Sequence, residues 1–184
     1  MSKVKRLLNS WARFIEVPWR DDAAAPQRVV FCVYQETDEL RLRAHIDEFE
    51  LATTNAGHNW ALFDLTNTFA NWMSEQKYAQ RYFQQPNLLP SILPGYAAYI
   101  SRKFKEFLDE HRAGENHVVA LKGVGSLFGF VKVKGVVDQL APLVPGRLLV
   151  FFPGSYEDNN YRLLDGYDGW NYLAVPITAD KDVL

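Results

Sequence analysis

The sequence predicts an α/β fold in three layers, with a mainly parallel sheet of four to five strands and helices on both faces. Short, continuous apolar runs rich in β-branched and aromatic residues recur along the chain, which is typical of buried parallel strands. Stretches with apolar residues at helical spacing alternate with these runs, as they do in helix-covered parallel sheets. The 184 residues fit a single domain, residues 1–184.

Strands are expected where the apolar runs are densest. They are Arg28–Tyr34, Trp60–Leu65, His117–Leu121 and Arg147–Phe152, with a last short strand at Leu173–Ile177. Pro176 lies in that last strand. Because proline cannot donate a ladder hydrogen bond, this strand is expected at an edge of the sheet.

Helices are expected in the intervals between these strands. They are predicted at residues 2–15, 37–56, 66–85, 96–112 and 126–140, with a loop at residues 87–95. The N-terminal helix, within residues 1–16, is amphipathic, with basic residues mostly opposite its apolar face. Residues 17–27, which contain Pro18 and Pro26, are expected to form a linker.

Composition and charge argue against several classes of protein. The chain carries 20 Lys and Arg residues against 22 Asp and Glu residues, a net charge of −2, which argues against binding a phosphate backbone. No uncharged apolar run approaches the roughly 18 residues of a membrane span, and the N-terminus lacks the apolar core of a secretory signal. Cys32 is the only cysteine, so we expect a cytoplasmic protein with no internal disulfide and a buried, inert thiol.

The loops after the strands are the places to look for a site, because ligands of open α/β sheets collect there. The loop after the first strand, Gln35–Glu39, has no glycine and no lysine, whereas a phosphate-cradling loop needs glycines and usually has a lysine to balance the charge. This loop therefore argues against nucleotide binding in the P-loop manner. In the second strand, Asp64 is a candidate metal or acid–base carboxylate, but a capping network with Thr66 or Asn67 is the plainer interpretation.

The third strand leads into Lys122-Gly123-Val124-Gly125-Ser126, a GxG sequence between a strand and a helix. In the dinucleotide-binding pattern the third glycine would fall at Phe128, whose side chain prevents the close helix–strand packing required there. A tight turn with Ser126 as the helix cap explains the sequence better. Binding of an anion, or of a partner's carboxylate, by Lys122 at the helix N-terminus stays open.

The fourth strand is followed by Phe152-Pro153-Gly154-Ser155-Tyr156, in which Pro-Gly predicts a turn. Aromatic residues then alternate with acids and one arginine. The relevant residues are Tyr156, Tyr161, Arg162, Tyr167, Asp168, Trp170 and Tyr172. Because Tyr, Trp and Arg concentrate binding energy at interfaces, this segment is either a partner-binding surface or a loop packed on itself.

No catalytic constellation can be read from the sequence. The four histidines and one cysteine lack zinc-site spacing, and no GxSxG motif occurs. We therefore expect no catalytic residues, no metal and no cofactor. Two alternatives stay open: an enzyme or nucleotide-binding protein that uses Glu36, Asp64 and Lys122, and a nucleic-acid-binding strip of Lys122, Lys132 and Lys134.

Several C-terminal motifs carry a family resemblance. They are Val119–Phe128 with its Gly-Val-Gly turn, Leu149–Tyr156 with its Phe-Pro-Gly, Arg162-Leu163-Leu164, and Asn171-Tyr172. Together they resemble the BrxB family of the bacteriophage exclusion (BREX) defence systems, well over about the last sixty residues and in layout over the rest. The chain carries Gly129–Lys134 where family members commonly have Pro and then Arg-Ser-His, which indicates a divergent or shortened member.

The resemblance implies a fold similar in layout to nucleotide-binding α/β folds but without their phosphate loop, which agrees with the loop at Gln35–Glu39. It also implies a non-enzymatic accessory component of a phage-defence complex. Its implied partner is PglZ, the alkaline-phosphatase-like protein of the same systems, together with other defence components. Neither a membrane nor direct nucleic-acid binding is expected. The candidate partner-binding residues lie in the strand-end turns and the aromatic segment: Lys122, Gly123, Gly125, Phe152, Pro153, Gly154, Tyr156, Tyr161, Arg162, Trp170 and Tyr172.

Overall fold

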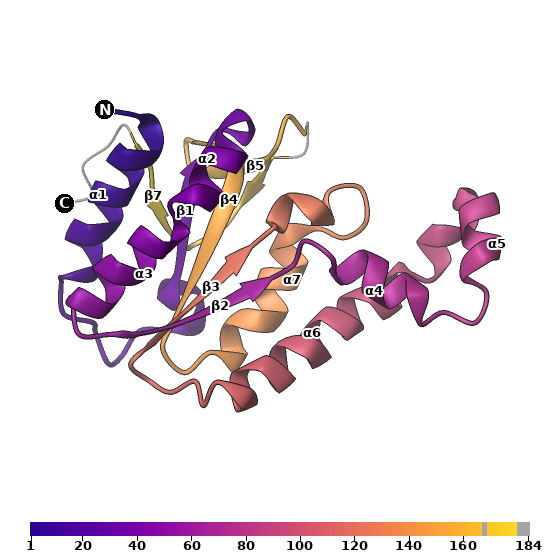
Figure 1. Cartoon of the computed structure of the whole chain (residues 1–184), viewed down its shortest axis with the longest axis horizontal. Helices are drawn as coiled ribbons and strands as arrows, with labels where there is room; N and C mark the ends of the chain where they lie inside the picture. The colour runs from indigo at the N-terminus through magenta and orange to yellow at the C-terminus, as the bar shows by residue number, and fades with distance from the viewer. Residues whose placement is uncertain (167–168, 180–184) are drawn as a thin grey trace.

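The computed structural model describes residues 1–166 and 169–179. In this part of the chain, β2, β3, β4, β1 and β7 lie side by side in that order, and β5 and β6 extend the seven-stranded sheet from β4 (Figure 1). The strands are β1 Val29–Tyr34, β2 Asn59–Asp64, β3 His117–Lys122, β4 Arg147–Glu157, β5 Asn160–Leu163, β6 Trp170–Asn171 and β7 Val175–Ile177. Each of the five apolar runs expected to form a strand overlaps one of them, and β4 continues five residues beyond its expected end at Phe152.

The sheet is mixed rather than mainly parallel. Pairs β2–β3, β3–β4, β4–β1 and β1–β7 are parallel, whereas β4–β5 and β5–β6 are antiparallel. The sequence does not predict the antiparallel part, because β5 and β6 have 4 and 2 residues, expose some of them and form no continuous apolar run. Pro176 lies in β7 at one end of the strand order, as expected of an edge strand.

The helices alternate with the strands along the chain. They are α1 Lys3–Ile15, α2 Glu39–Ala44, α3 Ile46–Asn55, α4 Thr68–Ser74, α5 Ala79–Gln84, α6 Leu93–Glu110 and α7 Val133–Leu140. Short 3-10 helices are η1 Ala25–Arg28, η2 Glu36–Asp38, η3 Pro86–Ser91, η4 Val124–Leu127 and η5 Ala141–Leu143, so η1 occupies the end of the expected linker. Within the described residues, no helix combines the length and apolar character needed to cross a membrane.

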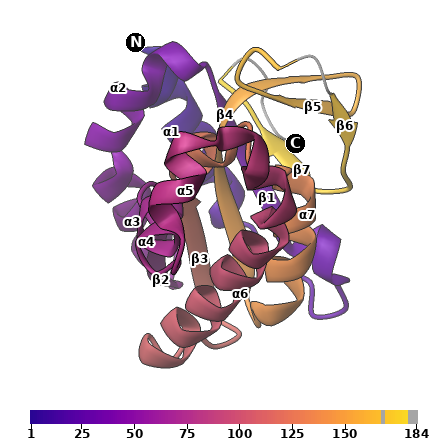
Figure 2. The same ribbon diagram turned by 90° about the vertical axis from the view of Figure 1, so that its right-hand side faces the viewer.

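Helices cover both faces of the sheet, with α1 and α3 on one face and α6 and α7 on the other (Figure 2). Successive residues of β1 alternate between two cores: Val30 and Cys32 pack on the α1–α3 side, and Val29 and Phe31 on the α6–α7 side. Cys32 is fully buried, and burial raises the pKa of its thiol. This agrees with the expectation of an inert cysteine.

Three of the expected helices, at residues 37–56, 66–85 and 126–140, are interrupted by backbone that is not helical. The helix predicted at residues 37–56 breaks at His45, whose φ of −111° and ψ of 5° separate α2 from α3. The helix predicted at residues 126–140 is an α-helix only from Val133. Gly129 precedes it with a φ of 81°, which a right-handed helix cannot contain.

A helical arm (residues 74–95) projects from the sheet and carries α5 at its far end (Figures 1 and 2). It divides the helix expected at residues 66–85 and replaces most of the loop expected at residues 87–95. Pro94 lies in the first turn of α6, where a missing N–H costs little. No residue of the arm is buried, and Tyr78 and Phe83 are 55% and 67% exposed. The arm therefore has no core of its own.

Candidate functional site at the carboxyl ends of the strands

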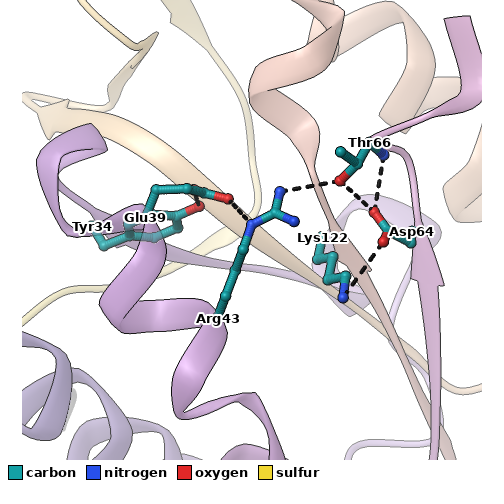
Figure 3. Close-up of polar contacts among 6 residues, drawn as sticks. All are labelled: Tyr34, Glu39, Arg43, Asp64, Thr66 and Lys122. Atoms are coloured by element: carbon teal, nitrogen blue, oxygen red, sulfur yellow. Dashed lines mark hydrogen bonds and ion pairs between the residues drawn. The ribbon is translucent and has the colours of Figure 1, made fainter. Parts of the chain in front are cut away.

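Polar side chains from β1, α2, β2 and β3, and from the loop after β2, meet beyond the carboxyl ends of these strands (Figure 3). Asp64 ends β2 and Lys122 ends β3, and these two residues face each other in the parallel register. Lys122 Nζ lies 3.4 Å from Asp64 Oδ2. Asp64 Oδ1 accepts hydrogen bonds from the Thr66 backbone N–H at 2.9 Å and from the Thr66 hydroxyl at 2.6 Å.

The second half of this network comes from β1 and α2. Arg43 Nη2 donates to the Thr66 hydroxyl at 3.1 Å, and Arg43 Nε pairs with Glu39 Oε1 at 2.6 Å. Glu39 Oε2 accepts a hydrogen bond from the Tyr34 hydroxyl at the end of β1. We call this chain of six residues, from Tyr34 to Lys122, the polar network.

The pKa of Asp64 reflects this environment. Partial burial alone would raise it, but the hydrogen bonds from Thr66 and the charge of Lys122 outweigh burial and lower it. Asp64 is therefore ionised and bound to Thr66, one of the two partners expected from the sequence. The other expected partner, Asn67, directly precedes α4, but its side chain makes no capping hydrogen bond to that helix.

Gly123 closes the turn behind the polar network. Its φ is 78°, in the left-handed region, and a Cβ there would lie 2.7 Å from the Thr66 backbone nitrogen and 3.0 Å from Asp64 Oδ1. The Gly-Val-Gly sequence thus forms a tight turn, as expected. Ser126 does not cap a helix, because residues 124–127 form η4 and the following α-helix begins only at Val133.

The charges of the polar network balance one another. Glu39 pairs with Arg43, and Asp64 pairs with Lys122. Lys122, expected to be available for an anion, already has a carboxylate beside it, and its side chain is 26% exposed. In the described part of the chain, no hydrogen bond or ion pair joins Glu36 to Asp64 or Lys122, so the three residues of the proposed enzyme alternative do not form one cluster.

The turn predicted at Pro153-Gly154 is wrong, because β4 continues through both residues. Pro153 pairs with Tyr34 in the parallel register, and Gly154 pairs with Leu163 in the antiparallel register. A Cβ at Gly154 would lie 3.1 Å from the backbone nitrogen of Leu164. The glycine therefore lets β5 approach β4 at the point where the pairing changes direction.

The aromatic segment packs largely on the core. Phe31 is surrounded by Tyr161, Phe152, Tyr172 and Trp170, with ring centroids at 4.6, 5.5, 5.7 and 5.8 Å. Phe152 and Tyr161 are 0% exposed and Tyr172 is 9% exposed. These three candidate partner-binding residues therefore support the surface from within and are out of a partner's reach in this conformation.

The other candidate residues lie nearer the surface, in two places. Lys122 is half-buried in the polar network, and Gly123 is buried directly behind it, whereas Arg162 is exposed and Tyr156 and Trp170 are partly exposed on the β4–β5–β6 extension. Tyr167 and Asp168 of the aromatic segment lie outside the described residues. Of the turn residues, Pro153 and Gly154 are buried; Gly125 is half-buried, and a Cβ there would lie 3.5 Å from Pro153 Cγ.

Two features are not predicted from the sequence. One is the contribution of Glu39 and Arg43, although a Glu and an Arg four residues apart after a strand are a readable signal for a helix-surface pair. The other is a groove of about 740 Å³ between residues 128–134 and the β5–β6 hairpin. We call this feature the groove. The sequence pattern does not predict it, because its two walls come from segments that are distant in the chain.

Comparison with known proteins gives one match. A family model described as BREX protein BrxB matches residues 62–176 of the 184. The matched segment begins within β2 and ends within β7, so it contains Asp64 and Lys122, the arm and both walls of the groove. Among curated proteins and among solved structures, nothing matches.

Proposed function

Because the chain belongs to the BrxB family, and is therefore a component of a BREX phage-defence system, we propose that it acts there as a non-enzymatic adaptor that binds a PglZ-like protein. PglZ-like proteins resemble alkaline phosphatases, and the family resemblance of the C-terminal motifs is what suggests this partner. In this proposal the chemistry of the complex belongs to other components.

The polar network is the observation that carries the non-enzymatic part of the proposal. A general base works best with a pKa near the operating pH, whereas the pKa of Asp64 is lowered by its partners. Lys122, the cation nearest to it, is held by the same carboxylate. The strand-end edge, where α/β enzymes bind substrates, is thus occupied by side chains that neutralise one another.

Exposed aromatic side chains support the binding part of the proposal. Phe128 is 48% exposed beside the groove, and Tyr78 and Phe83 on the arm are more exposed still. Aromatic residues are enriched in the cores of protein interfaces because they bury a large apolar area at low entropic cost. Both features lie within the segment that the family model matches.

The experiment that tests the proposal is complex formation between purified proteins. The chain and a PglZ-like protein of the same defence system are mixed at micromolar concentration and separated by size-exclusion chromatography. We expect one co-eluting complex. Separate elution of the two proteins would overturn the proposal.

The alternative, a nucleotide-dependent enzyme that uses Asp64 and Lys122, is tested on the same protein. Melting is followed with and without ATP, NAD and divalent cations, because a ligand that binds only the folded state raises the melting temperature. A reproducible rise that is lost in Lys122→Met would favour this alternative over the adaptor.

A further inference from the structure

The groove runs between two walls formed by distant segments of the chain. Residues 128–134, after η4 and into the first turn of α7, form one wall. The β5–β6 hairpin forms the other, through Leu163, Asp165, Gly166, Gly169 and Trp170. Its volume of about 740 Å³ lies within the range of roughly 300–1,000 Å³ that is usual for ligand pockets. The groove therefore has room for a few side chains, not for a globular surface.

Both walls are held in place by aromatic stacking. Phe130 stacks on Phe69 of α4 with ring centroids 3.9 Å apart, and Trp170 stacks on buried Tyr161 at 5.3 Å. Phe128 reaches the opposite wall, because a Cβ at Gly166 would lie 3.2 Å from its ring. A groove supported in this way loses little conformational freedom when it is filled, which favours binding.

The described residues in and around the groove include three cations, Lys132, Lys134 and Arg162, and two acids, Asp165 in the lining and Asp138 beside Lys134. Lys132 and Arg162 are exposed, and within residues 1–166 and 169–179 neither makes an ion pair or a side-chain hydrogen bond. The Arg162 guanidinium lies beside Gly169, and Lys134 is 3.9 Å from Asp138 with both side chains about half exposed. This local excess contrasts with the net charge of −2 of the whole chain.

We propose that the groove binds a short apolar segment of the protein partner that also carries carboxylates. This inference rests on the proposed adaptor function and specifies the chemistry of the contact. Apolar side chains of the segment are buried against Phe128 and Leu163, and its carboxylates pair with Lys132 and Arg162. The acidic chain and the apolar walls favour a peptide over a nucleic acid, which would need many more cations.

Charge reversal in the groove tests this inference. The affinity of the PglZ-like protein is measured for wild type, Lys132→Glu/Lys134→Glu and Phe128→Ala, at about 50 mM and about 300 mM salt. We expect the double variant to lose roughly tenfold or more in affinity at low salt and less at high salt. Phe128→Ala should weaken binding at both salt concentrations, because the contact that it removes is apolar.

The control for charge reversal is Lys3→Glu/Lys5→Glu on α1. It changes two exposed lysines with the same spacing on the other face of the sheet. Circular dichroism of each variant establishes that it is folded. We expect the control to bind like wild type.

The outcomes separate this inference from the adaptor function on which it rests. If wild type forms no complex, the adaptor function fails. If the complex forms but the groove variants bind like wild type, the groove inference alone is overturned. Salt-sensitive binding of a DNA duplex that the double lysine variant abolishes would also overturn it, and would assign the groove to nucleic acid.

Discussion

Gly123 is the residue on which the geometry of the polar network depends. The carboxylate of Asp64 and the backbone of Thr66 approach its Cα so closely that a Cβ would lie 2.7 Å from the Thr66 nitrogen. Its φ of 78° is also a conformation that other residues adopt at a cost. Both the turn after β3 and the contact between the ends of β2 and β3 therefore require a residue without a side chain at position 123.

We expect Gly123→Ala to lower the free energy of unfolding by about 1–3 kcal/mol, because it combines a left-handed backbone with a steric overlap. Urea unfolding followed by circular dichroism measures the change. Gly135→Ala is the control, because Gly135 lies within α7 and a Cβ there meets nothing within 4 Å. This control should gain up to about 1 kcal/mol from helix propensity. Equal stabilities of the two variants would contradict the prediction.

At the scale of elements, the sequence predicts well those strands that are buried on both faces. All six residues of β1 are buried, and so are the four central residues of β3, so both appear as continuous apolar runs. The extension of β4 is missed for a physical reason. Pro153-Gly154 is locally a turn signal, but pairing with β1 on one side and with β5 on the other keeps the strand extended.

The arm is the element that helical spacing predicts least well. An apolar stripe predicts a helix because it normally faces a core. In α5 no residue is buried, and only Ala79 and Tyr82 pack partly against the main core, so this packing does little to fix the length of the helix or its continuity with α4. The aromatic residues there are predicted correctly as helical, but their exposure cannot be read from their spacing.

We expect Phe83→Ser on the arm to change the free energy of unfolding by no more than about 0.5 kcal/mol, because the side chain is 67% exposed. Phe104→Ala in α6 is the contrasting variant. Its side chain is 0% exposed, and the loss should be about 3–5 kcal/mol. Urea unfolding of both variants provides the measurement. A loss above 1 kcal/mol for Phe83→Ser would contradict the prediction and would mean that Phe83 itself packs against the body in solution.

At the scale of the whole molecule, the site depends on register as much as on residue type. Asp64 and Lys122 are both recognisable as candidates, but they become an ion pair only because β2 and β3 pair in parallel with these residues opposite each other. Similarly, the groove exists only because the β5–β6 hairpin folds back over the segment before α7. Strand pairing between distant segments is what the sequence pattern leaves undetermined.

The two cores share one sheet, and this bears on whether the chain unfolds as one unit. In β4, Leu149 and Phe151 belong to the core under α1 and α3, whereas Val150 and Phe152 belong to the core under α6 and α7. Neither core can be exposed without disturbing the strand that serves both. We therefore infer that the chain, predicted to be a single domain, unfolds cooperatively.

Cys32 offers a direct measurement of this cooperativity. It is the only thiol, it is 0% exposed in β1, and burial raises its pKa, so it does not react in the folded protein. We expect the urea midpoint for labelling of Cys32 by a thiol reagent to coincide with the midpoint from far-UV circular dichroism, as in two-state unfolding. Labelling at urea concentrations well below that midpoint would show that β1 and α1 open before the rest, and would contradict the single cooperative unit.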